Sequence, residues 1–454
     1  MNPMFLRAPL RLAVALGLGL LVARAQPLAI APFDADATPA PGSNLAYDPM
    51  TAAGDLTLRC RGVVIRGAGD PIVLAAIDWI GVANESHDAF RDLLAAAAGT
   101  TRSRVAIHAL HQHDAPVADR TSERILASRG IAPGCFHSDI VRPAMLRASN
   151  AVARASTNAV ALTHVGWGQA EVFQVASNRR VPGTNGFVRA VRYTATPDAA
   201  LRAAPEGLID PLVVAVGLWS HDKPVAVLTY YATHPQSFYR TGIAHPDFPG
   251  IARFLRDQAV PGTLHVHFNG AGGNLGAGKY NDGNPTNRPV LARRLADGME
   301  RAWKGMQRHP VTTADVGWSS EVVQLPLAPH LKSDELDAAL RRPSPALYVQ
   351  AAQLAFVERR QQQAPTDVSC LRLGDIRILH LPGELFVEYQ LAARLMRPDL
   401  HVAMAAYGDY GPQYIGTEKA YGLGGYETEP RSSGVAPSVQ RVLFPALQRL
   451  LTAP

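Results

Sequence analysis

Short β-rich runs and helical stretches alternate through almost all of this 454-residue sequence, from residue 56 to residue 451. The pattern predicts strands at residues 56–66, 71–77, 104–110, 161–167, 188–193, 212–219, 225–233, 263–268 and 401–406, with two more before Pro382. It predicts helices at residues 85–98, 138–157, 248–258, 287–306, 334–363, 384–395 and 435–451. Residues 26–49, rich in Pro, Ala and Asp, are predicted to be mostly irregular. Since no linker interrupts the alternation, we predict one large α/β (α+β) domain, a mixed β-sheet flanked by helices.

The first 25 residues have the composition of an export signal. Arg7 and Arg11 precede an uncharged apolar run at residues 12–22, and Ala23 and Ala25 stand where a signal peptidase reads small side chains. The run is too short to span a bilayer comfortably. We therefore predict a signal peptide at residues 1–25, a mature chain of residues 26–454 without an integral membrane segment, and a periplasmic or secreted location. A short anchor that stays uncleaved is the alternative.

The charge balance argues against nucleic acid as a partner. Removing the three arginines of the signal lowers the formal net charge from +6 to +3, and no basic run with interleaved aromatic residues occurs. Cys60, Cys135 and Cys370 form no CxxC pair, and their spacing does not identify a disulfide. The sequence does not predict the oligomeric state.

Three histidines follow predicted strands. His111 and His113 come directly after residues 104–110, and in an extended backbone their side chains point the same way. His234 directly follows the strand predicted at residues 225–233 and precedes a proline. Imidazoles at strand ends can hold zinc, although an HxH pair alone is more often structural. Asp114 is a candidate acceptor that would fix the tautomer of a neighbouring imidazole.

A carboxylate and a group of tyrosines follow later in the chain. Glu384 stands after Pro382-Gly383 at a predicted strand-to-helix junction, where a helix dipole also favours an acid. Tyr407, Tyr410 and Tyr414 lie among glycines, outside the predicted helices. A tyrosine there can stack on a substrate, donate a proton or coordinate a metal as phenolate.

Taken in order, these clusters resemble the catalytic domain of the neutral ceramidases, a family of zinc amidases. The resemblance covers roughly residues 34–430, and the order of seven segments carries it rather than any one of them. The segments are Asp36-Ala37-Thr38-Pro39, Ile77-Asp78, His111-Gln112-His113-Asp114-Ala115-Pro116, His234-Pro235, Asp247-Phe248-Pro249-Gly250, Pro382-Gly383-Glu384 and the stretch from Tyr414 to Glu427.

The resemblance implies a Zn²⁺ cofactor with a water completing its shell and four protein ligands, His111, His234, Glu384 and Tyr414. It implies catalytic roles for His113, Arg179 and Tyr426, and it places Asn178 near the substrate carbonyl. In the glycine-rich loop at residues 270–283 we assign Asn274 and Gly276 to substrate binding, because glycine lets the backbone approach a ligand closely.

The sequence also departs from the ceramidases. No serine occurs from residue 238 to residue 318, where the family has a serine with an assigned nucleophilic role. We therefore expect direct attack by metal-activated water. The chain ends near the end of the catalytic domain, so we expect it to lack the C-terminal β-sandwich of the ceramidases.

Three other motifs, one for nucleotide binding and two for hydrolysis, are disfavoured. Gly273-x4-Gly278-Lys279 is followed by Tyr280, whereas a phosphate-binding loop needs Ser or Thr there. Neither a G-x-S-x-G elbow nor an HExxH helix occurs.

The sequence thus predicts an exported zinc-dependent amidohydrolase that cleaves the linear amide bond of a small N-acylated substrate, a lipid such as ceramide or a sugar. A zinc esterase or deacetylase acting on a carbohydrate or other non-lipid substrate is the alternative. A non-catalytic exported binding protein on the same fold is the third. Few consecutive apolar residues flank the clusters, which favours a shorter substrate than a long-chain lipid.

Overall fold

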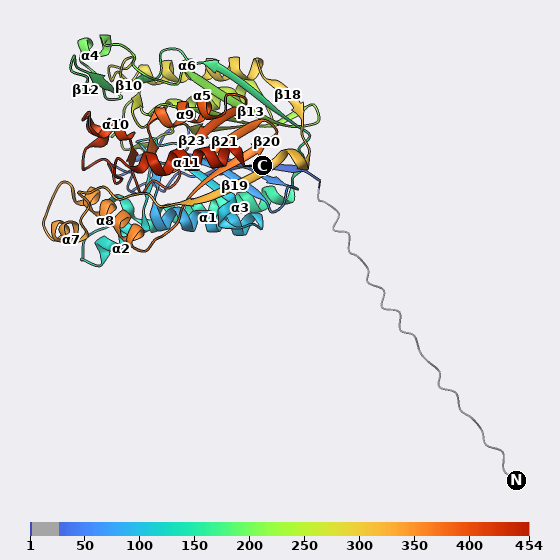
Figure 1. The fold of residues 1–454 in the computed structure, drawn as a ribbon, viewed down its shortest axis with the longest axis horizontal. Helices are drawn as coiled ribbons and strands as arrows, with labels where there is room; N and C mark the ends of the chain where they lie inside the picture. Colours follow the sequence, from blue (N-terminus) through green and yellow to red (C-terminus); the bar gives the residue numbers. More distant parts are fainter. Residues whose placement is uncertain (2–26, 454) are drawn as a thin grey trace.

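Three β-sheets form the framework of the computed structural model (Figure 1). The first has the order β6 (Val105–Ala109), β4 (Ile72–Ile77), β3 (Arg59–Arg66), β1 (Ala29–Asp36) and β8 (Val160–Ala161). The second has the order β16 (Leu264–Asn269), β14 (Lys223–Tyr231), β13 (Leu212–Ser220), β9 (His164–Glu171) and β18 (Gln307–Pro310). The third has the order β19 (Val316–Val323), β20 (Thr366–Leu373), β21 (Ile376–His380) and β23 (His401–Ala405).

The structure describes Met1 and residues 27–453. The predicted signal peptide therefore lies outside the described residues, Met1 excepted. No helix in the described part of the chain is both long and apolar enough to cross a membrane. The described residues form one mixed α/β domain, as the sequence predicts.

Alternating side chains bury both faces of each sheet. In β4, Leu74 joins a central cluster shared by all three sheets, whereas Ala75 faces an outer cluster. Val216 of β13 and Ile378 of β21 belong to the same central cluster. This period of two is what a β-strand imposes on its side chains. One core therefore lies between the sheets, and further apolar clusters, one of them larger, lie between the sheets and the helices that cover them.

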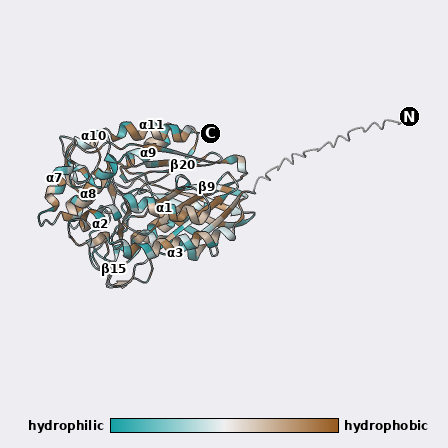
Figure 2. Cartoon of the chain, turned by 90° about the horizontal axis from the view of Figure 1, so that it is seen from below, coloured by the Kyte–Doolittle hydropathy of each residue, from teal (hydrophilic) through white to brown (hydrophobic). Residues whose placement is uncertain are grey.

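Each sheet has its own helices. α1 (Asn84–Ala98) and α3 (Ser138–Thr157) cover the first, and α5 (Asp247–Ala259) and α6 (Asn287–Lys304) cover the second. α9 (Val387–Met396) and α11 (Val439–Thr452) pack on the third. In Figure 1, α6 lies above the sheets and α1 and α3 lie below them. Figure 2 shows hydrophilic and hydrophobic segments side by side on α1 and α3, as expected for helices with one buried face.

Short elements complete the domain. The remaining helices are α2 (Arg120–Ala127), α4 (Ala199–Ala203), α7 (Ser333–Leu340), α8 (Leu347–Gln361) and α10 (Glu418–Tyr421). The remaining strands pair two by two: β2 (Ala52–Ala53) with β15 (Ile243–Ala244), β5 (Gly81–Val82) with β7 (Val117–Ala118), β10 (Ser177–Asn178) with β17 (Leu275–Gly276), β11 (Arg180–Pro182) with β12 (Val188–Val191), and β22 (Glu384–Leu385) with β24 (Tyr414–Ile415).

Three of the predicted elements were wrong. The segment expected to be irregular contains β1, an interior strand of the first sheet, where Ala29 to Asp36 pair in full with β3. The helix expected over residues 334–363 is two helices, α7 and α8, separated by a segment that contains Pro343 and Pro345. The helix expected from residue 384 begins at residue 387, because Glu384 pairs with Tyr414 in a short parallel ladder instead.

Candidate metal centre

The carboxyl ends of parallel strands from all three sheets meet at one place. Each sheet has one parallel pair at its edge: β4 with β6, β14 with β16, and β21 with β23. β6 leads to His111 and His113, β14 leads to His234, and β21 and β23 lead to Glu384 and Tyr414. Ligands bind beyond the carboxyl ends of such strands in open α/β sheets. The topology therefore brings together residues that lie up to 303 positions apart.

Two residues of this region have a left-handed backbone. His111 has φ 68° and Tyr407 has φ 60°. For a residue other than glycine this conformation costs about 1–3 kcal/mol and is kept where the surroundings fix it. Here the His111 N–H donates to the Trp79 carbonyl at 2.8 Å, and the Tyr407 N–H donates to the Gly383 carbonyl at 2.9 Å. The two rings stack with their centroids 4.9 Å apart. The strained backbone and the stacked Tyr407 ring thus hold His111 in one orientation.

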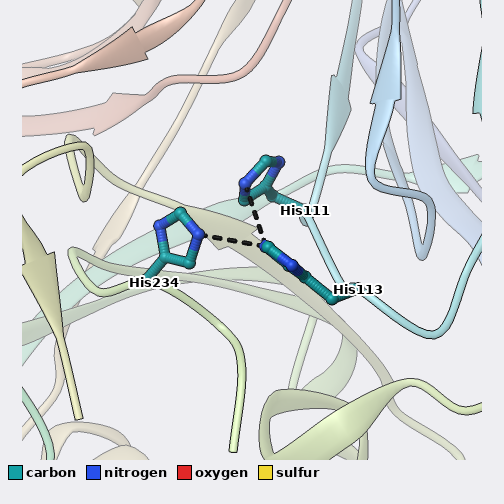
Figure 3. A group of neighbouring side chains, drawn as sticks. All are labelled: His111, His113 and His234. Carbon is teal, nitrogen blue, oxygen red and sulfur yellow. Dashed lines mark hydrogen bonds between the residues drawn. The ribbon is translucent and has the colours of Figure 1, made fainter. Parts of the chain in front are cut away.

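The three imidazoles converge on one small volume (Figure 3). His113 Nε2 lies 3.3 Å from His111 Nε2 and 3.0 Å from His234 Nε2. His111 Nδ1 lies 2.7 Å from the Ile80 carbonyl oxygen, so Nδ1 carries the proton and Nε2 presents a lone pair. All three side chains are buried.

A carboxylate completes the group. Glu384 Oε2 lies 3.3 Å from His111 Nε2 and 3.9 Å from His234 Nδ1, and the Glu384 side chain is 1 % exposed. Its other oxygen, Oε1, accepts a hydrogen bond from the Tyr410 hydroxyl at 2.9 Å. Oε2, His113 Nδ1 and His234 Nδ1 have no hydrogen-bond partner among the described residues. Of these atoms, Glu384 Oε2 faces His111 Nε2, and an orphaned buried oxygen of this kind points to an ion or water that binds it.

The distances fit a tetrahedral zinc ion. With bonds of about 2.0–2.1 Å, the ligand atoms of tetrahedral zinc lie about 3.3 Å apart. The contacts of His111 Nε2 with Glu384 Oε2 and with His113 Nε2 match that edge. Imidazole nitrogen and carboxylate oxygen are both ligands that zinc accepts. The residues present therefore fit the ion that the sequence predicts.

Burial also keeps the three imidazoles in the neutral state that a metal ligand requires. Desolvation lowers the pKa of His111 to about 3 and holds the pKa of His113 and of His234 well below the usual value. All three rings are therefore neutral at physiological pH, as metal ligands must be. Burial raises the pKa of Glu384 to about 8, against the opposing effect of Arg179. A bound cation would reverse that rise, because it favours the ionised carboxylate.

Tyr414 lies at the edge of this group, in contact with Arg179. The Arg179 guanidinium donates to the Tyr414 hydroxyl at 3.1 Å and to Glu427 Oε1 at 3.1 Å. Its Cζ lies 5.7 Å from the centre of the Tyr426 ring. Burial raises the pKa of Tyr414 well above its usual value, and Arg179 opposes that rise. The structure thus brings Arg179, Tyr414 and Tyr426 together beside Glu384, as the sequence-based assignment requires, without testing their roles.

The three predicted substrate-binding residues, Asn178, Asn274 and Gly276, adjoin Arg179. Asn178 and Gly276 belong to the paired strands β10 and β17. The Asn178 amide donates to the Leu208 carbonyl at 2.9 Å and accepts from the Arg180 N–H at 3.0 Å. The Asn274 amide donates to Glu388 and accepts from the Val387 N–H, both at 2.9 Å, at the start of α9. Both amides are therefore engaged within the protein, and their substrate-binding roles stay predictions.

The glycine-rich loop packs against the backbone of Glu384 and of Thr233, the residue before His234. A Cβ atom on Gly272 would lie 2.7 Å from the Thr233 carbonyl oxygen, next to His234. A Cβ atom on Gly273 would overlap the Glu384 carbonyl oxygen. These positions therefore admit no side chain, and the loop packs directly against the backbone that carries His234 and Glu384.

One expectation about the surroundings is wrong. The Asp114 carboxylate accepts hydrogen bonds from the Thr241 N–H at 3.2 Å and from its hydroxyl at 2.8 Å. It does not orient an imidazole, because the Ile80 carbonyl does so for His111. The carboxylate of Asp247, from another of the seven segments, accepts a hydrogen bond from the Ser237 hydroxyl and forms an ion pair with Arg288.

Sequence reasoning missed two aromatic residues at His113. The Tyr47 ring stacks on the His113 ring at 5.5 Å, and the Tyr239 ring meets it edge-on at 5.3 Å. Tyr47 is 42 % exposed and Tyr239 is 40 % exposed, so both also face solvent. No spacing rule connects these two loop residues to a histidine far from both in sequence, and only the folded chain places them there.

Solved structures provide the comparison with known proteins. No protein-family model and no curated protein matches the sequence. The fold is similar to that of a ceramidase complexed with C2, with a TM-score of 0.67 and 17 % identity over 94 % of this chain and 74 % of that one. It is also similar to the neutral ceramidase from Pseudomonas aeruginosa, with a TM-score of 0.65 and 18 % identity over 94 % of this chain and 73 % of that one. The domain described above therefore has a neutral ceramidase-like fold.

Proposed function

We propose that this protein is an exported zinc-dependent amidohydrolase that cleaves the linear amide bond of a small N-acylated substrate. One observation carries the proposal: the Glu384 carboxylate and the buried His111 imidazole present ligand atoms 3.3 Å apart, and His113 Nε2 lies 3.0–3.3 Å from the His111 and His234 imidazoles, beside the ion that these residues would hold. The similarity in fold to ceramidases supports the reaction class. His111, His234, Glu384 and Tyr414 would hold the ion.

When bound, zinc would polarise the substrate carbonyl and lower the pKa of a water molecule. The chain supplies the proton transfers. In the proposed mechanism, His113 Nε2 accepts a proton as water oxygen adds to the carbonyl carbon, since its lowered pKa keeps the ring neutral beforehand. The C–N bond then breaks, the nitrogen takes the proton from His113, and a carboxylate and an amine leave.

Arg179 would position the Tyr414 hydroxyl beside the reacting carbonyl. Its guanidinium is fixed by Glu427 and donates to Tyr414, so it keeps that hydroxyl directed at the site. Tyr426 packs against both the guanidinium and the Tyr414 ring. A serine nucleophile has no place in the glycine-rich loop, since a side chain at residue 272 or 273 would meet backbone atoms. Direct attack by water accounts for this better than an acyl-serine.

The proposal is tested by metal analysis joined to a release assay. We expect one zinc ion per chain, and we expect His111→Ala or His234→Ala to lose both the ion and turnover, because each removes one of few protein ligands. The assay should contain paired amide and ester substrates with the same acyl group. Full activity of metal-free protein under chelation would overturn the proposal. Turnover of esters but not amides would establish the esterase or deacetylase alternative, and zinc binding without any turnover would establish a binding protein.

A further inference from the structure

Two loop segments, residues 46–53 and residues 239–244, form a rim beside His113. They are joined to each other by the parallel ladder of β2 and β15. The second segment is also fixed to the strand end that carries His113. The Thr241 N–H and hydroxyl donate to the buried carboxylate of Asp114, the residue after His113. The rim therefore has a defined position next to the metal centre.

The rim carries an arginine above the aromatic ring that stacks on His113. Arg240 Cζ lies 5.9 Å from the centre of the Tyr47 ring, and that centre lies 5.5 Å from the centre of the His113 ring. The Arg240 side chain is 58 % exposed, and its Nε contacts Asp48 Oδ2 at 3.4 Å. Its two Nη atoms donate to no residue in the described part of the chain. They therefore remain available to a ligand that reaches the rim from the centre.

A cavity of about 400 Å³ lies against the same rim, with Arg240 among its lining residues. Tyr47 and Tyr410, which contact His113 and Glu384 of the metal centre, also line it. The volume falls within the range for small-ligand pockets, about 300–1,000 Å³. A substrate with its carbonyl at the centre would therefore have one arm directed past these tyrosines into the cavity.

The walls of the cavity are mostly apolar. They include Ile80, Val117, Phe136, Tyr348, Val349 and Ala352. Asp119 also lines it but is 2 % exposed, and its carboxylate accepts hydrogen bonds from the Asn84 amide and the Ser122 N–H. The charge that a ligand can reach there is therefore that of the exposed Arg240 guanidinium.

We propose that the amine arm of the substrate is an apolar amino acid, whose carboxylate pairs with Arg240 and whose side chain enters the cavity. The inference rests on the proposed function, because it names the amine that the centre releases. A guanidinium can donate two parallel N–H···O bonds to a carboxylate, and an apolar side chain gains by leaving water for an apolar cavity. In the hydrolysis, water gives its hydroxyl to the acyl carbon and its proton to the nitrogen. The C–N bond breaks, and a carboxylic acid and a free amino acid leave.

The test compares matched amides with the zinc-loaded enzyme. N-acetylleucine carries both features, N-acetylleucinamide lacks only the charge, and N-acetylglycine lacks the side chain. N-succinylisoamylamine carries its carboxylate on the acyl arm instead. Acetate release is measured for the first three compounds and amine release for the fourth. We expect kcat/KM for N-acetylleucine to exceed that of each other compound by about 10-fold, a moderate value because Arg240 is exposed.

Variants at the rim then assign the preference for the carboxylate. Arg240→Gln should reduce the ratio of N-acetylleucine to N-acetylleucinamide to about 1, whereas Arg240→Lys keeps the charge and should retain part of the preference. Arg308→Gln is the matched control and should leave the ratio unchanged. Arg308 likewise lies over an aromatic ring, that of Trp219 at 6.0 Å, and pairs with Asp222 at 3.1 Å. Added salt should weaken the wild-type preference, because the ion pair is exposed.

A variant of the cavity wall tests the place of the side chain. Ala352→Phe narrows the cavity and should lower kcat/KM for N-acetylleucine relative to N-acetylglycine by about 10-fold. Ala338→Phe, at an exposed alanine of α7, is its control and should keep that ratio. An unchanged ratio in Ala352→Phe would overturn the assignment of the side chain to this cavity.

The remaining outcomes separate this inference from the proposed function. Equal rates for N-acetylleucine and its carboxamide in the wild type, with amide hydrolysis intact, would overturn the inference and leave the amidohydrolase standing. A carboxylate preference that survives Arg240→Gln, or faster turnover of N-succinylisoamylamine than of N-acetylleucine, would also overturn it. Absence of hydrolysis for every amide, with zinc bound, would overturn the proposed function itself.

Discussion

At the scale of single residues, the identity of the fourth metal ligand is the sharpest question. The sequence resemblance names Tyr414, whereas the distances bring His113 Nε2 within 3.3 Å of both other imidazoles. Tyr414→Phe keeps the ring and removes the only coordinating atom. If Tyr414 is a ligand, this variant should bind zinc at least 10-fold more weakly and lose turnover by orders of magnitude. His113→Ala should then keep the ion but lose the proton transfer.

Zinc affinity measured by competition with a chelator decides between the two residues. Tyr410→Phe is the control, because it removes a hydrogen bond to Glu384 and not a ligand. It should keep one zinc per chain and lower turnover about 10- to 100-fold, as the loss of such a supporting contact does. Near-normal zinc affinity and rate in Tyr414→Phe, with zinc lost in His113→Ala, would assign the fourth position to His113.

The residues also show what the sequence could and could not reveal about the site. His111, His234, Glu384 and Tyr414 could be predicted to lie together because each stands beside a strand end in a motif of recognisable order, and their roles as ligands stay predictions. Tyr47 and Tyr239 were missed because their contacts with His113 cross the fold, and no local spacing encodes such contacts. Asp114 was misassigned because adjacency to a histidine in sequence does not place its carboxylate beside that ring.

At the scale of elements, the glycine-rich loop should tolerate no side chain at residue 272. Gly272→Ala places a methyl group 2.7 Å from the Thr233 carbonyl oxygen, a backbone atom that cannot rotate away. We expect a loss of about 1–3 kcal/mol in the free energy of unfolding, together with weaker zinc binding through the shifted His234. Gly422→Ala is the control, because its nearest contact would be an ordinary 3.6 Å. Chemical denaturation of both variants measures the difference.

The start of α2 should make stability depend on pH. Burial raises the pKa of Asp119, the residue that caps this helix, from 3.8 to about 7, and nearby Asp409 adds to the rise. The folded protein therefore holds a proton there that the unfolded chain has already released, so stability from this group is complete at acid pH and falls as the pH rises toward 7. Asp119→Asn keeps a capping side chain and removes the titration.

Denaturation of wild type and Asp119→Asn across that range provides the measurement. The free energy of unfolding of the wild type should fall relative to the variant by up to about 1.4 kcal/mol per pH unit between the two pKa values. Using the difference between the two proteins cancels the other groups that titrate, Glu384 among them. Parallel pH profiles would show that Asp119 is ionised in the folded state.

The elements themselves were predictable to different degrees. α3 was predicted with its observed bounds, because its helical periodicity is long and a Ser-Asp pair opens it. β1 was missed because Pro32 and its alanines have weak strand propensity, and only pairing with β3 on one side and β8 on the other makes the segment a strand. Glu384 was expected in a helix, and its parallel pairing with Tyr414 overrides that local preference.

At the scale of the whole molecule, the metal should add to global stability. An ion that binds the folded chain and not the unfolded one stabilises it by an amount that grows with the logarithm of its concentration, about 4 kcal/mol at a thousandfold excess over Kd. Chelation should therefore lower the Tm of the wild type, measured by calorimetry. The His111→Ala variant should show no such change, since it has already lost the ion. An equal fall in both proteins would mean that the chelator acts elsewhere.

The placement of the centre at the junction of three sheets has a consequence for how the chain folds. Its components come from residues 111 to 414, so no fragment that contains one sheet can assemble it. Contacts between such distant segments form late and slowly, because a long loop must close before they contribute any stability. A nascent or partly folded chain offers only isolated histidines, so under the proposed function a chain would bind its ion only after all three sheets have docked.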